Sequence, residues 1–340
     1  MNPATVPVSP SRLTRRALEE RIASFRGKRV LVVGDVILDR YLWGRATRVS
    51  PEAPVLVVDI EREELRLGGA ANVAHNVHAL GADPILIGVV GEDQAAADLD
   101  RLLRSRGVDP SGLVRDPSRR TTLKTRIIAH HQQVLRADEE SRDGLAAAPE
   151  NALWDRVEQA IGRADAALVS DYGKCVVTPA LLSKLLPALE RNGVPSAVDP
   201  KEEHFFRYTG VSVITPNASE AAQAWGRRLK TEAELIEAGF GLREKLDAGS
   251  VLITRGDEGM SLFTREGHTH FPTRARRVYD VTGAGDTVVA TIATALAAKA
   301  SLPEACVLAN HAAGIVVAQL GTATAAAEEL IASLEDLPVG

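Results

Sequence analysis

The sequence has few cysteines, few aromatic residues and no surplus of basic residues. Its 340 residues include two cysteines, which excludes a disulfide framework and leads us to expect a reducing, cytoplasmic setting. Aromatic residues make up 4% of the chain, and 45 acidic against 40 basic residues leave a net charge of −5. Nucleic-acid binding requires a basic surface and stacking side chains, so nucleic acid is not an expected partner.

Targeting signals and long apolar runs are also missing. Residues 1–10 contain three prolines and no apolar stretch typical of an export signal. We therefore expect residues 1–26 to form an N-terminal arm and a lead-in helix. The longest apolar candidate, residues 287–298, is shorter than the ~20 residues that cross a bilayer, so no membrane partner is expected.

Short β-branched segments alternate with segments of helical length. Strands are predicted at residues 29–34, 84–90, 166–170, 196–199, 211–215 and 251–254. Helices are predicted at residues 70–80, 94–106, 179–192, 231–247, 284–299 and 303–320. This alternation predicts an α/β fold with a mostly parallel central sheet flanked by helices, in a domain of residues 27–330 followed by a tail of residues 331–340.

Two segments interrupt this alternation. Residues 41–67 and 121–140 show partial period-two patterning and do not look helical. They are either long loops or a small antiparallel sheet that projects from the main domain as a lid, and we favour the lid because long unstructured loops are uncommon. An exposed edge of such a sheet would favour pairing with a second copy, which predicts a homodimer through the lid.

The common nucleotide-binding motifs are absent or incomplete, and the informative segment is residues 280–286, DVTGAGD. Gly283, Ala284 and Gly285 stand at the start of a predicted helix, where free backbone N–H groups bind anions. Asp286 beside them could accept a proton from an attacking hydroxyl. It could equally be an acidic residue that stabilises the first turn of its own helix.

A second segment, residues 68–93, begins with a glycine pair that enters a predicted helix. Gly69 would permit a ligand to approach the backbone closely, and Asn72 could offer its amide to a hydroxyl. Taken alone, the same pattern could be simple helix capping.

Together the two segments resemble the paired signatures of the ribokinase-like (PfkB) carbohydrate kinase family, over about residues 28–325. The resemblance implies a ribokinase-like α/β fold with a small β-sheet lid over the sugar, and ATP-dependent phosphorylation of a sugar hydroxyl. Residues 34–44, 48–55, 171–174 and 320–324 are similar to the D-glycero-β-D-manno-heptose 7-phosphate kinases within this family.

That narrower resemblance implies phosphorylation of the anomeric C1 hydroxyl of heptose 7-phosphate, on the way to ADP-heptose and the lipopolysaccharide core. Many relatives carry a nucleotidyltransferase with an H-x-G-H motif after the kinase. This sequence contains no such motif, so we expect the stand-alone kinase form.

The resemblance also implies roles for particular residues. Catalysis would use Asp286 as the base and Gly283, Ala284 and Gly285 as the anion hole. The phosphosugar would meet Asp35, Gly69, Asn72, Arg136, Asp171 and Lys174. ATP would lie along Asn217, Glu220, Thr254, Gly256, Gly259, Asn310 and Gly314. Glu220 would orient Mg²⁺ through water, and Asp280 and Thr282 would hold a monovalent cation such as K⁺.

Several of these residues have a simpler interpretation. Asp35 could be a turn residue at a strand end, and Asn217 with Glu220 fits a helix capping box. Lys174 and Arg136 could form surface ion pairs. Cys175 stands where glycine is expected after the DYGK segment.

Two other functions stay open at this point. One is a ribokinase-like kinase for a different phosphosugar. The other is a catalytically silent regulator of the same fold that binds a sugar or a nucleotide.

Overall fold

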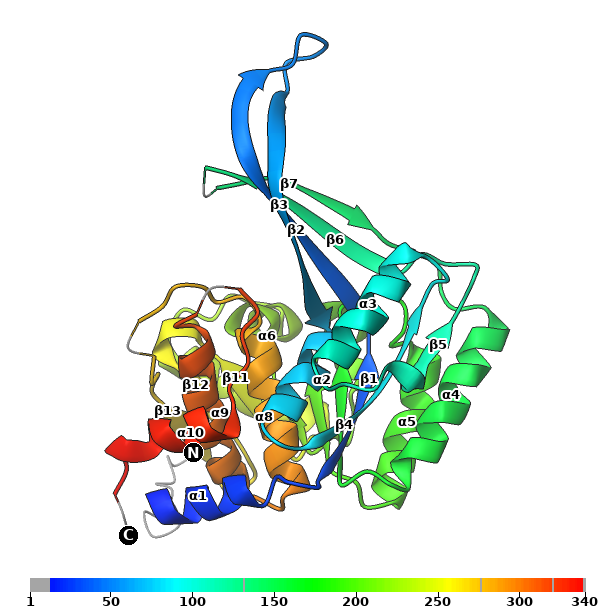
Figure 1. Ribbon diagram of the computed structural model, residues 1–340. Helices are drawn as coiled ribbons and strands as arrows, with labels where there is room; N and C mark the ends of the chain where they lie inside the picture. The colour runs from blue at the N-terminus through cyan, green and yellow to red at the C-terminus, as the bar shows by residue number, and fades with distance from the viewer. Residues whose placement is uncertain (1–12, 131, 276, 320, 339–340) are drawn as a thin grey trace.

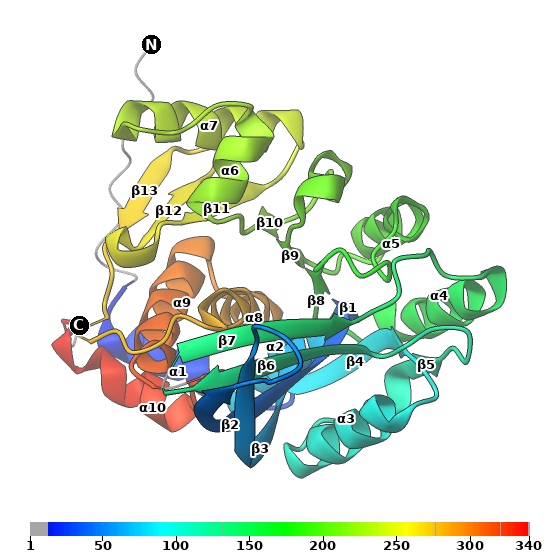
Figure 2. The ribbon, with the colours of Figure 1, turned by 90° about the horizontal axis from the view of Figure 1, so that it is seen from above.

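A central sheet of nine strands organises the chain. The computed structural model describes residues 13–130, 132–275, 277–319 and 321–338. The strands of this sheet are β1 (Arg29–Gly34), β4 (Asp83–Val90), β5 (Leu113–Arg115), β8 (Ala166–Ser170), β9 (Ser196–Asp199), β10 (Val213–Ile214), β11 (Ser250–Thr254), β12 (Met260–Phe263) and β13 (His268–Phe271). Their order is β13-β12-β11-β10-β9-β8-β1-β4-β5, which can be followed in Figure 2, a view from above the molecule of Figure 1. All six predicted strands are present, and they pair in parallel, whereas β12 and β13 extend one edge by antiparallel pairing.

Helices cover both faces of this sheet (Figure 2). One layer contains α1 (Arg15–Ala23), α2 (Ala70–Ala79), α3 (Gln94–Ser105), α8 (Ala284–Ala297), α9 (Leu302–Val316) and α10 (Ala327–Ser333). The other contains α4 (Ala147–Ile161), α5 (Pro179–Arg191), α6 (Ala218–Trp225) and α7 (Glu232–Lys245). Strand β1 shows why its sequence is continuously apolar: Val30 and Val32 pack into the first layer, and Leu31 and Val33 into the second. The predicted α/β architecture is confirmed.

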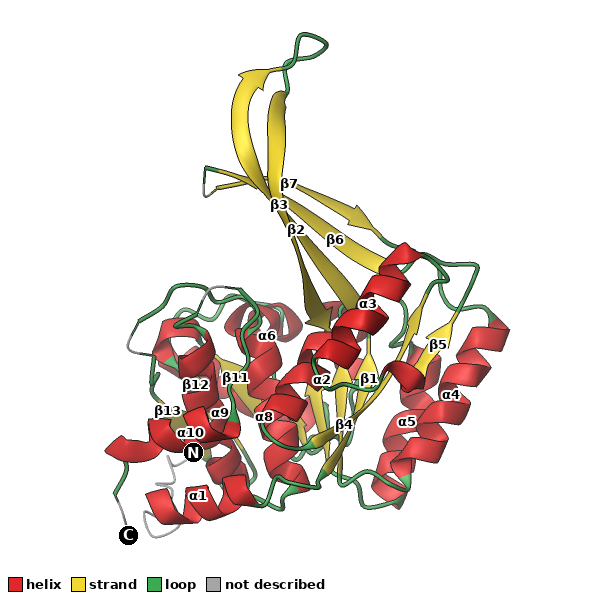
Figure 3. Ribbon diagram, viewed as in Figure 1, coloured by secondary structure: helices red, strands yellow, loops and turns green. Residues whose placement is uncertain are grey.

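A second, four-stranded sheet rises from the main domain (Figure 3). It contains β2 (Val36–Val49), β3 (Leu56–Gly69), β6 (Thr122–Ala129) and β7 (Gln132–Glu139), in the order β3-β2-β6-β7. The two hairpins are antiparallel, as expected, and the β2–β6 pair that joins them is parallel. The sheet begins earlier than the sequence pattern suggested, because β2 starts at Val36, two residues after β1 ends.

The edge strand β7 of the second sheet is open. All eight of its residues are exposed, including Val134 and Leu135. An unpaired, partly apolar strand edge is a surface on which another strand can pair.

The terminal segments are described in part. Helix α1 lies within the predicted lead-in segment, whereas residues 1–12 of the predicted arm lie outside the described residues. At the other end, α10 continues to Ser333, past the start of the tail expected at residue 331, and residues 339–340 are not described. Within the described ranges, none of the helices combines the length and apolar character needed to span a bilayer.

Candidate active site

Carboxylates gather where the parallel strands end. Asp35 follows β1, Asp171 follows β8, and Asp199 is the last residue of β9. The register places Gly34 beside Ser170 and Ser170 beside Asp199, so the three carboxylates leave the same edge of the sheet. In open α/β sheets, ligands bind outside the carboxyl ends of the strands.

Helix α8 begins at this edge with an open N-terminus. Gly283 is its N-cap with a φ of 79°, a left-handed conformation that glycine adopts without strain, and no side chain caps the helix. A Cβ on Gly283 would come within 3.1 Å of Asn72 Nδ2, a tight contact that would push the Asn72 amide aside. A Cβ on Gly285 would meet nothing within 4 Å. The first turn of α8 is therefore uncapped and open beside Gly285, which is an arrangement suited to an anion.

Asp286 lies on that first turn and is buried, with 6% of its surface exposed. Asn72 Nδ2 donates to its Oδ2 at 2.6 Å, and the Tyr172 hydroxyl donates to its Oδ1. Burial raises the pKa of Asp286 to about 6, and these two hydrogen bonds oppose the rise. The carboxylate is thus ionised at neutral pH yet more basic than an exposed aspartate, as a general base requires.

Asn72 is left with an unused acceptor. Its Nδ2 is engaged with Asp286, but Oδ1 is buried and has no hydrogen-bond partner. A buried acceptor without a partner is costly, and a hydroxyl group brought in beside Asp286 would satisfy it. Asn72 and Asp286, which the sequence placed in one site, do lie together.

Asp35 lies at the site, but its oxygens bind the protein itself. They accept hydrogen bonds from the backbone N–H groups of Tyr172, Lys174 and Val176, at 2.7, 3.0 and 3.0 Å. Burial raises the pKa of Asp35 to about 6. The structure therefore shows Asp35 as the anchor of the loop after β8.

Asp171 anchors the same loop from its other side. It accepts from the Gly173 N–H at 2.8 Å and from the Tyr208 hydroxyl at 2.5 Å, and its Oδ2 lies 2.8 Å from His204 Nδ1. Its side chain is fully buried. Like Asp35, it is brought to the site and is engaged there in holding the loop.

The loop also accounts for the unusual Cys175. This residue has a φ of 69°, in the left-handed region that favours glycine, which is the residue expected at this position. Its Sγ lies 3.3 Å from the Arg142 carbonyl oxygen.

Cations gather on one face of the second sheet, where Arg126 and Arg136 lie opposite each other, and on this loop, which carries Lys174. Arg126 pairs with Asp39 at 2.5 Å, Arg136 with Asp138 at 2.9 Å, and Lys174 with Glu140 at 2.6 Å. Arg136 is half exposed, so its pair with Asp138 matches the simple surface interpretation.

Lys124 belongs to the same face and differs from these cations. It stands opposite Asp39 on β2 and Asp138 on β7, both of which bind an arginine. No carboxylate among the described residues forms an ion pair with Lys124. Burial, followed by the charge of Lys174, lowers its pKa. A half-buried lysine beside other cations favours an anionic ligand.

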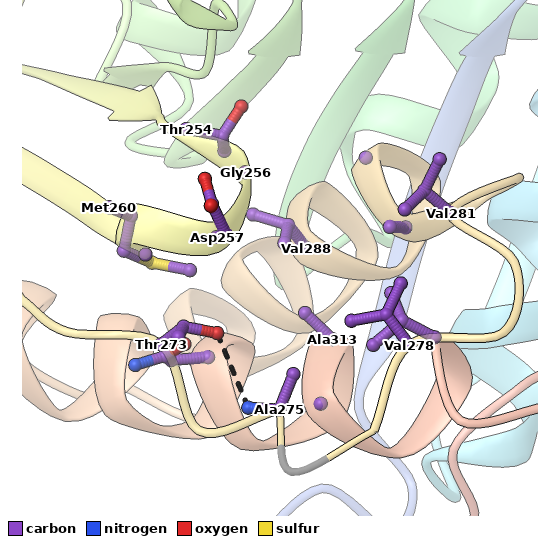
Figure 4. A pocket seen from close by; sticks show the side chains of 16 residues that line it. Thr254, Gly256, Asp257, Met260, Thr273, Ala275, Val278, Val281, Val288 and Ala313 are labelled. Carbon is purple, nitrogen blue, oxygen red and sulfur yellow. Dashed lines mark hydrogen bonds between the residues drawn. The ribbon is translucent and has the colours of Figure 1, made fainter.

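A cavity of about 250 Å³ adjoins the start of α8 (Figure 4). Apolar side chains such as Met260, Val278 and Val281 line it, together with Ala284 and Gly285 of the anion hole. Seven residues were expected beside the nucleotide. Apart from Asn217 and Glu220, all of them line this cavity: Thr254, Gly256, Gly259, Asn310 and Gly314. A mostly apolar cleft that ends at an anion-binding helix start fits a nucleotide with its phosphates directed toward Asp286.

Asn217 and Glu220 form a capping box on α6. Asn217 Oδ1 accepts from the Glu220 N–H at 3.0 Å, and Glu220 Oε2 accepts from the Asn217 N–H at 2.9 Å. The interpretation of this pair as a helix capping box is therefore confirmed. The second carboxylate oxygen of Glu220 takes no part in the bond to the Asn217 N–H.

The carboxylates near this pair fit a hydrated divalent ion. Burial, followed by the charges of Asp286 and Glu220, raises the pKa of Asp199 well above its usual value. Lys201 offsets part of the negative charge of Asp199 and Glu220, and a hydrated divalent cation would offset more of it. No three metal-ligating side chains gather within the described part of the chain, so water and phosphate oxygens would complete the coordination.

Asp280 and Thr282 are less suited to a cation. Asp280 Oδ1 accepts from the Thr282 N–H and hydroxyl at 2.9 and 2.7 Å, and its Oδ2 accepts from the Gly321 N–H at 2.9 Å. The side chain of Asp280 thus ties two loops together. Any monovalent ion here would depend on backbone carbonyl oxygens.

Solved kinase structures share this architecture. Ribokinase from Arabidopsis thaliana, complexed with ribose and ATP, has a TM-score of 0.72 and 18% identity, covering 91% of this chain and 99% of that one. Phosphofructokinase-2 from Escherichia coli, in complex with substrates and products, has a TM-score of 0.75 and 18% identity, covering 92% and 99%. The fold is therefore ribokinase-like, as the sequence motifs led us to expect.

The chain belongs to the pfkB family of carbohydrate kinases, whose family pattern matches residues 28–329. It is thus an ATP-dependent phosphotransferase, and the family implies ATP and a divalent metal ion. The bifunctional protein HldE of Geotalea uraniireducens is 45% identical over 323 residues, 95% of this chain and 66% of the relative. HldE of Paramagnetospirillum magneticum is 45% identical over 328 residues, 95% and 67%. The chain spans about two thirds of the length of these relatives.

Proposed function

We propose that the protein transfers the γ-phosphoryl group of ATP to the C1 hydroxyl of D-glycero-β-D-manno-heptose 7-phosphate, giving the 1,7-bisphosphate. The identity to HldE proteins and the heptose-kinase-like segments 34–44, 48–55 and 171–174 support this substrate. The observation that carries the chemistry is Asp286, a buried carboxylate on the open first turn of α8. The product would serve the formation of ADP-heptose for the lipopolysaccharide core.

In the proposed reaction, Asp286 accepts the proton of the C1 hydroxyl while the hydroxyl oxygen of the sugar attacks the γ-phosphorus. The bond from the γ-phosphorus to the β,γ-bridging oxygen breaks, and ADP leaves. The N–H groups at the start of α8, of which that of Ala284 also contacts the Val281 carbonyl oxygen, would stabilise charge on the transferring group, which is the dominant contribution in phosphoryl transfer. Glu220 would orient Mg²⁺ through water, and the ion would neutralise charge on the phosphates.

The 7-phosphate is proposed to lie against the cations of the second sheet. Lys174 and Arg136 are the residues that the sequence suggests, and Lys124 is the cation there without a carboxylate partner among the described residues. A cationic sheet face would favour a phosphosugar over a neutral sugar. The second sheet then acts as a lid that excludes water from the transfer.

The assembly and setting are part of the same proposal. The exposed edge strand β7 supports a homodimer through the second sheet. The two free cysteines and the use of ATP favour the cytoplasm. A monovalent cation is a further candidate, since a structure of Escherichia coli phosphofructokinase-2 is in complex with potassium.

The decisive assay is turnover of ATP with a panel of phosphosugars, with the products followed by phosphorus NMR. We expect heptose 7-phosphate to be the preferred acceptor and the 1,7-bisphosphate to accumulate without ADP-heptose. Preference for another phosphosugar would show that the protein is a ribokinase-like kinase for that substrate. Binding without turnover of any acceptor would make it a silent regulator, and formation of ADP-heptose would contradict a single kinase activity.

A further inference from the structure

Tyr172 lies directly against the proposed base, on the loop that follows β8. Its hydroxyl donates to Asp286 Oδ1, while Asn72 Nδ2 donates to Oδ2 at 2.6 Å. We infer that Tyr172 is a positioning residue whose hydroxyl fixes the orientation of the Asp286 carboxylate by donating a hydrogen bond to it. The inference rests on the proposed function in taking Asp286 as the base.

The loop is built to hold Tyr172 in place. Asp35 binds the backbone N–H groups of Tyr172 and of two later residues, and Asp171 is fixed by the Tyr208 hydroxyl. Both carboxylates are buried, and burying a carboxylate is costly unless its hydrogen bonds are satisfied. Two buried carboxylates that bind one short loop indicate that the loop holds the Tyr172 side chain in a fixed position.

Burial and neighbouring carboxylates disfavour the charge of Asp286. Burial is the largest influence on its pKa, and the charge of Asp39 from β2 adds to it, although Asp39 is paired with Arg126. From the end of β9, Asp199 also interacts with Asp286. The two groups that favour the ionised form are Asn72 and Tyr172.

A phenol suits this role. Burial, followed by the charge of Asp286, raises the pKa of Tyr172 well above its usual value, so its hydroxyl stays a donor wherever the enzyme works. A neutral donor stabilises the carboxylate without cancelling its charge, so the group keeps the basicity that proton transfer needs. Because a carboxylate offers about four acceptor sites, the substrate hydroxyl can bind while both donors remain.

The test is the pH dependence of kcat/KM for Tyr172→Phe. Loss of a donor to the ionised form raises the pKa of Asp286, so the acid limb should move to higher pH by about one to two units. From a starting value of about 6, this predicts a loss of about two- to ten-fold at pH 7 that largely recovers at pH 9. If Tyr172 had a merely structural role, the substitution would lower kcat/KM at every pH and leave the acid limb of the pH profile in place.

A matched control removes a different buried hydroxyl that also binds a carboxylate. Tyr208→Phe loses the bond to Asp171, which helps to hold the loop, but keeps the Tyr172 hydroxyl as a donor to Asp286. It should lower the melting temperature to a similar extent as Tyr172→Phe and leave the acid limb where it is.

A second measurement does not depend on turnover. The ¹³Cγ signal of Asp286, identified by its loss in Asp286→Asn, should titrate at higher pH in Tyr172→Phe than in the wild type. An unshifted titration in the folded variant overturns the assignment of Tyr172. If the titration shifts while the wild type does not phosphorylate heptose 7-phosphate, the proposed function fails and the assignment of Tyr172 stands.

Discussion

Replacement of Lys124 by methionine tests the proposed phosphate site with the least disturbance to the rest of the protein. Lys174 would be a poorer target, because its removal leaves Glu140, whose side chain is 9% exposed, with only the longer 3.5 Å contact to the exposed Arg142. Lys124 has no carboxylate partner among the described residues, and Asp39 and Asp138 keep their arginines. Methionine retains the stem of the side chain, so the main loss is the positive charge.

The expected size follows from the interaction that is lost. A hydrogen bond to a charged group contributes about 1.5–3 kcal/mol, which is a factor of about 10 to 150 in kcat/KM. That loss should appear with heptose 7-phosphate and stay below about three-fold with unphosphorylated heptose, which has no charge to bind. Arg136→Ala should cost less than Lys124→Met, because Arg136 is half exposed and already paired.

The assay measures kcat/KM for both sugars on Lys124→Met and on Lys184→Met. Lys184 lies exposed on α5, on the opposite layer of the main domain, and controls for the loss of one lysine charge. Equal losses with the two sugars would show that Lys124 supports the second sheet and not the phosphate. An unchanged kcat/KM with the phosphosugar would place the phosphate elsewhere.

Two further outcomes follow from the loop and from the sheet edge. Cys175→Gly should raise the free energy of unfolding by about 1 kcal/mol, because glycine adopts the left-handed backbone without a strained Cβ. Cys175→Ser keeps the Cβ and should not raise it. Thermal or denaturant unfolding measures both variants, and equal stabilities would refute the backbone strain. Leu135→Lys on β7 should shift the protein from dimer to monomer in sedimentation while the melting temperature of the monomer stays near that of the wild type, and a dimer that persists would place the interface elsewhere.

The sequence predicts the main sheet well because its strands are buried on both faces. A short, continuous apolar run such as residues 166–170 is typical of a central parallel strand, and the helical segments between such runs are long. The edge strand β5 has three residues and was not expected, since so short a segment carries no periodic signal. Strands β12 and β13 likewise depend on pairing with β11 for their conformation.

The site was predictable where its signal is local. The Gly-Ala-Gly sequence before Asp286 marks an open helix N-terminus, and the capping box of Asn217 and Glu220 can be recognised from spacing alone. Tyr172 was missed because its partner Asp286 lies 114 positions away, and no local pattern reports that contact.

Long separation along the sequence is also the reason that the surroundings of Asp35 and Lys124 could not be predicted. Asp35 binds backbone groups 137 to 141 positions away, contacts that its local sequence does not indicate, and its expected contact with the sugar stays a prediction. Lys124 lies in an alternating segment where a lysine normally points to solvent. Its importance emerges only when Arg126, Arg136 and Lys174 are seen to be paired beside it.

The most direct test of the account is the turnover of Asp286→Asn. The substitution keeps the size of the side chain and removes the base, so kcat should fall by about 10²–10⁴-fold. Affinity for ATP should hold or rise slightly, because a negative charge beside the phosphates is lost, and the pattern of lower kcat with intact binding marks an interaction made in the transition state. If Asp286 only stabilised the first turn of α8, the variant would lose less than about 1 kcal/mol of stability and keep its activity. Turnover near that of the wild type in a folded Asp286→Asn protein would contradict the proposed mechanism.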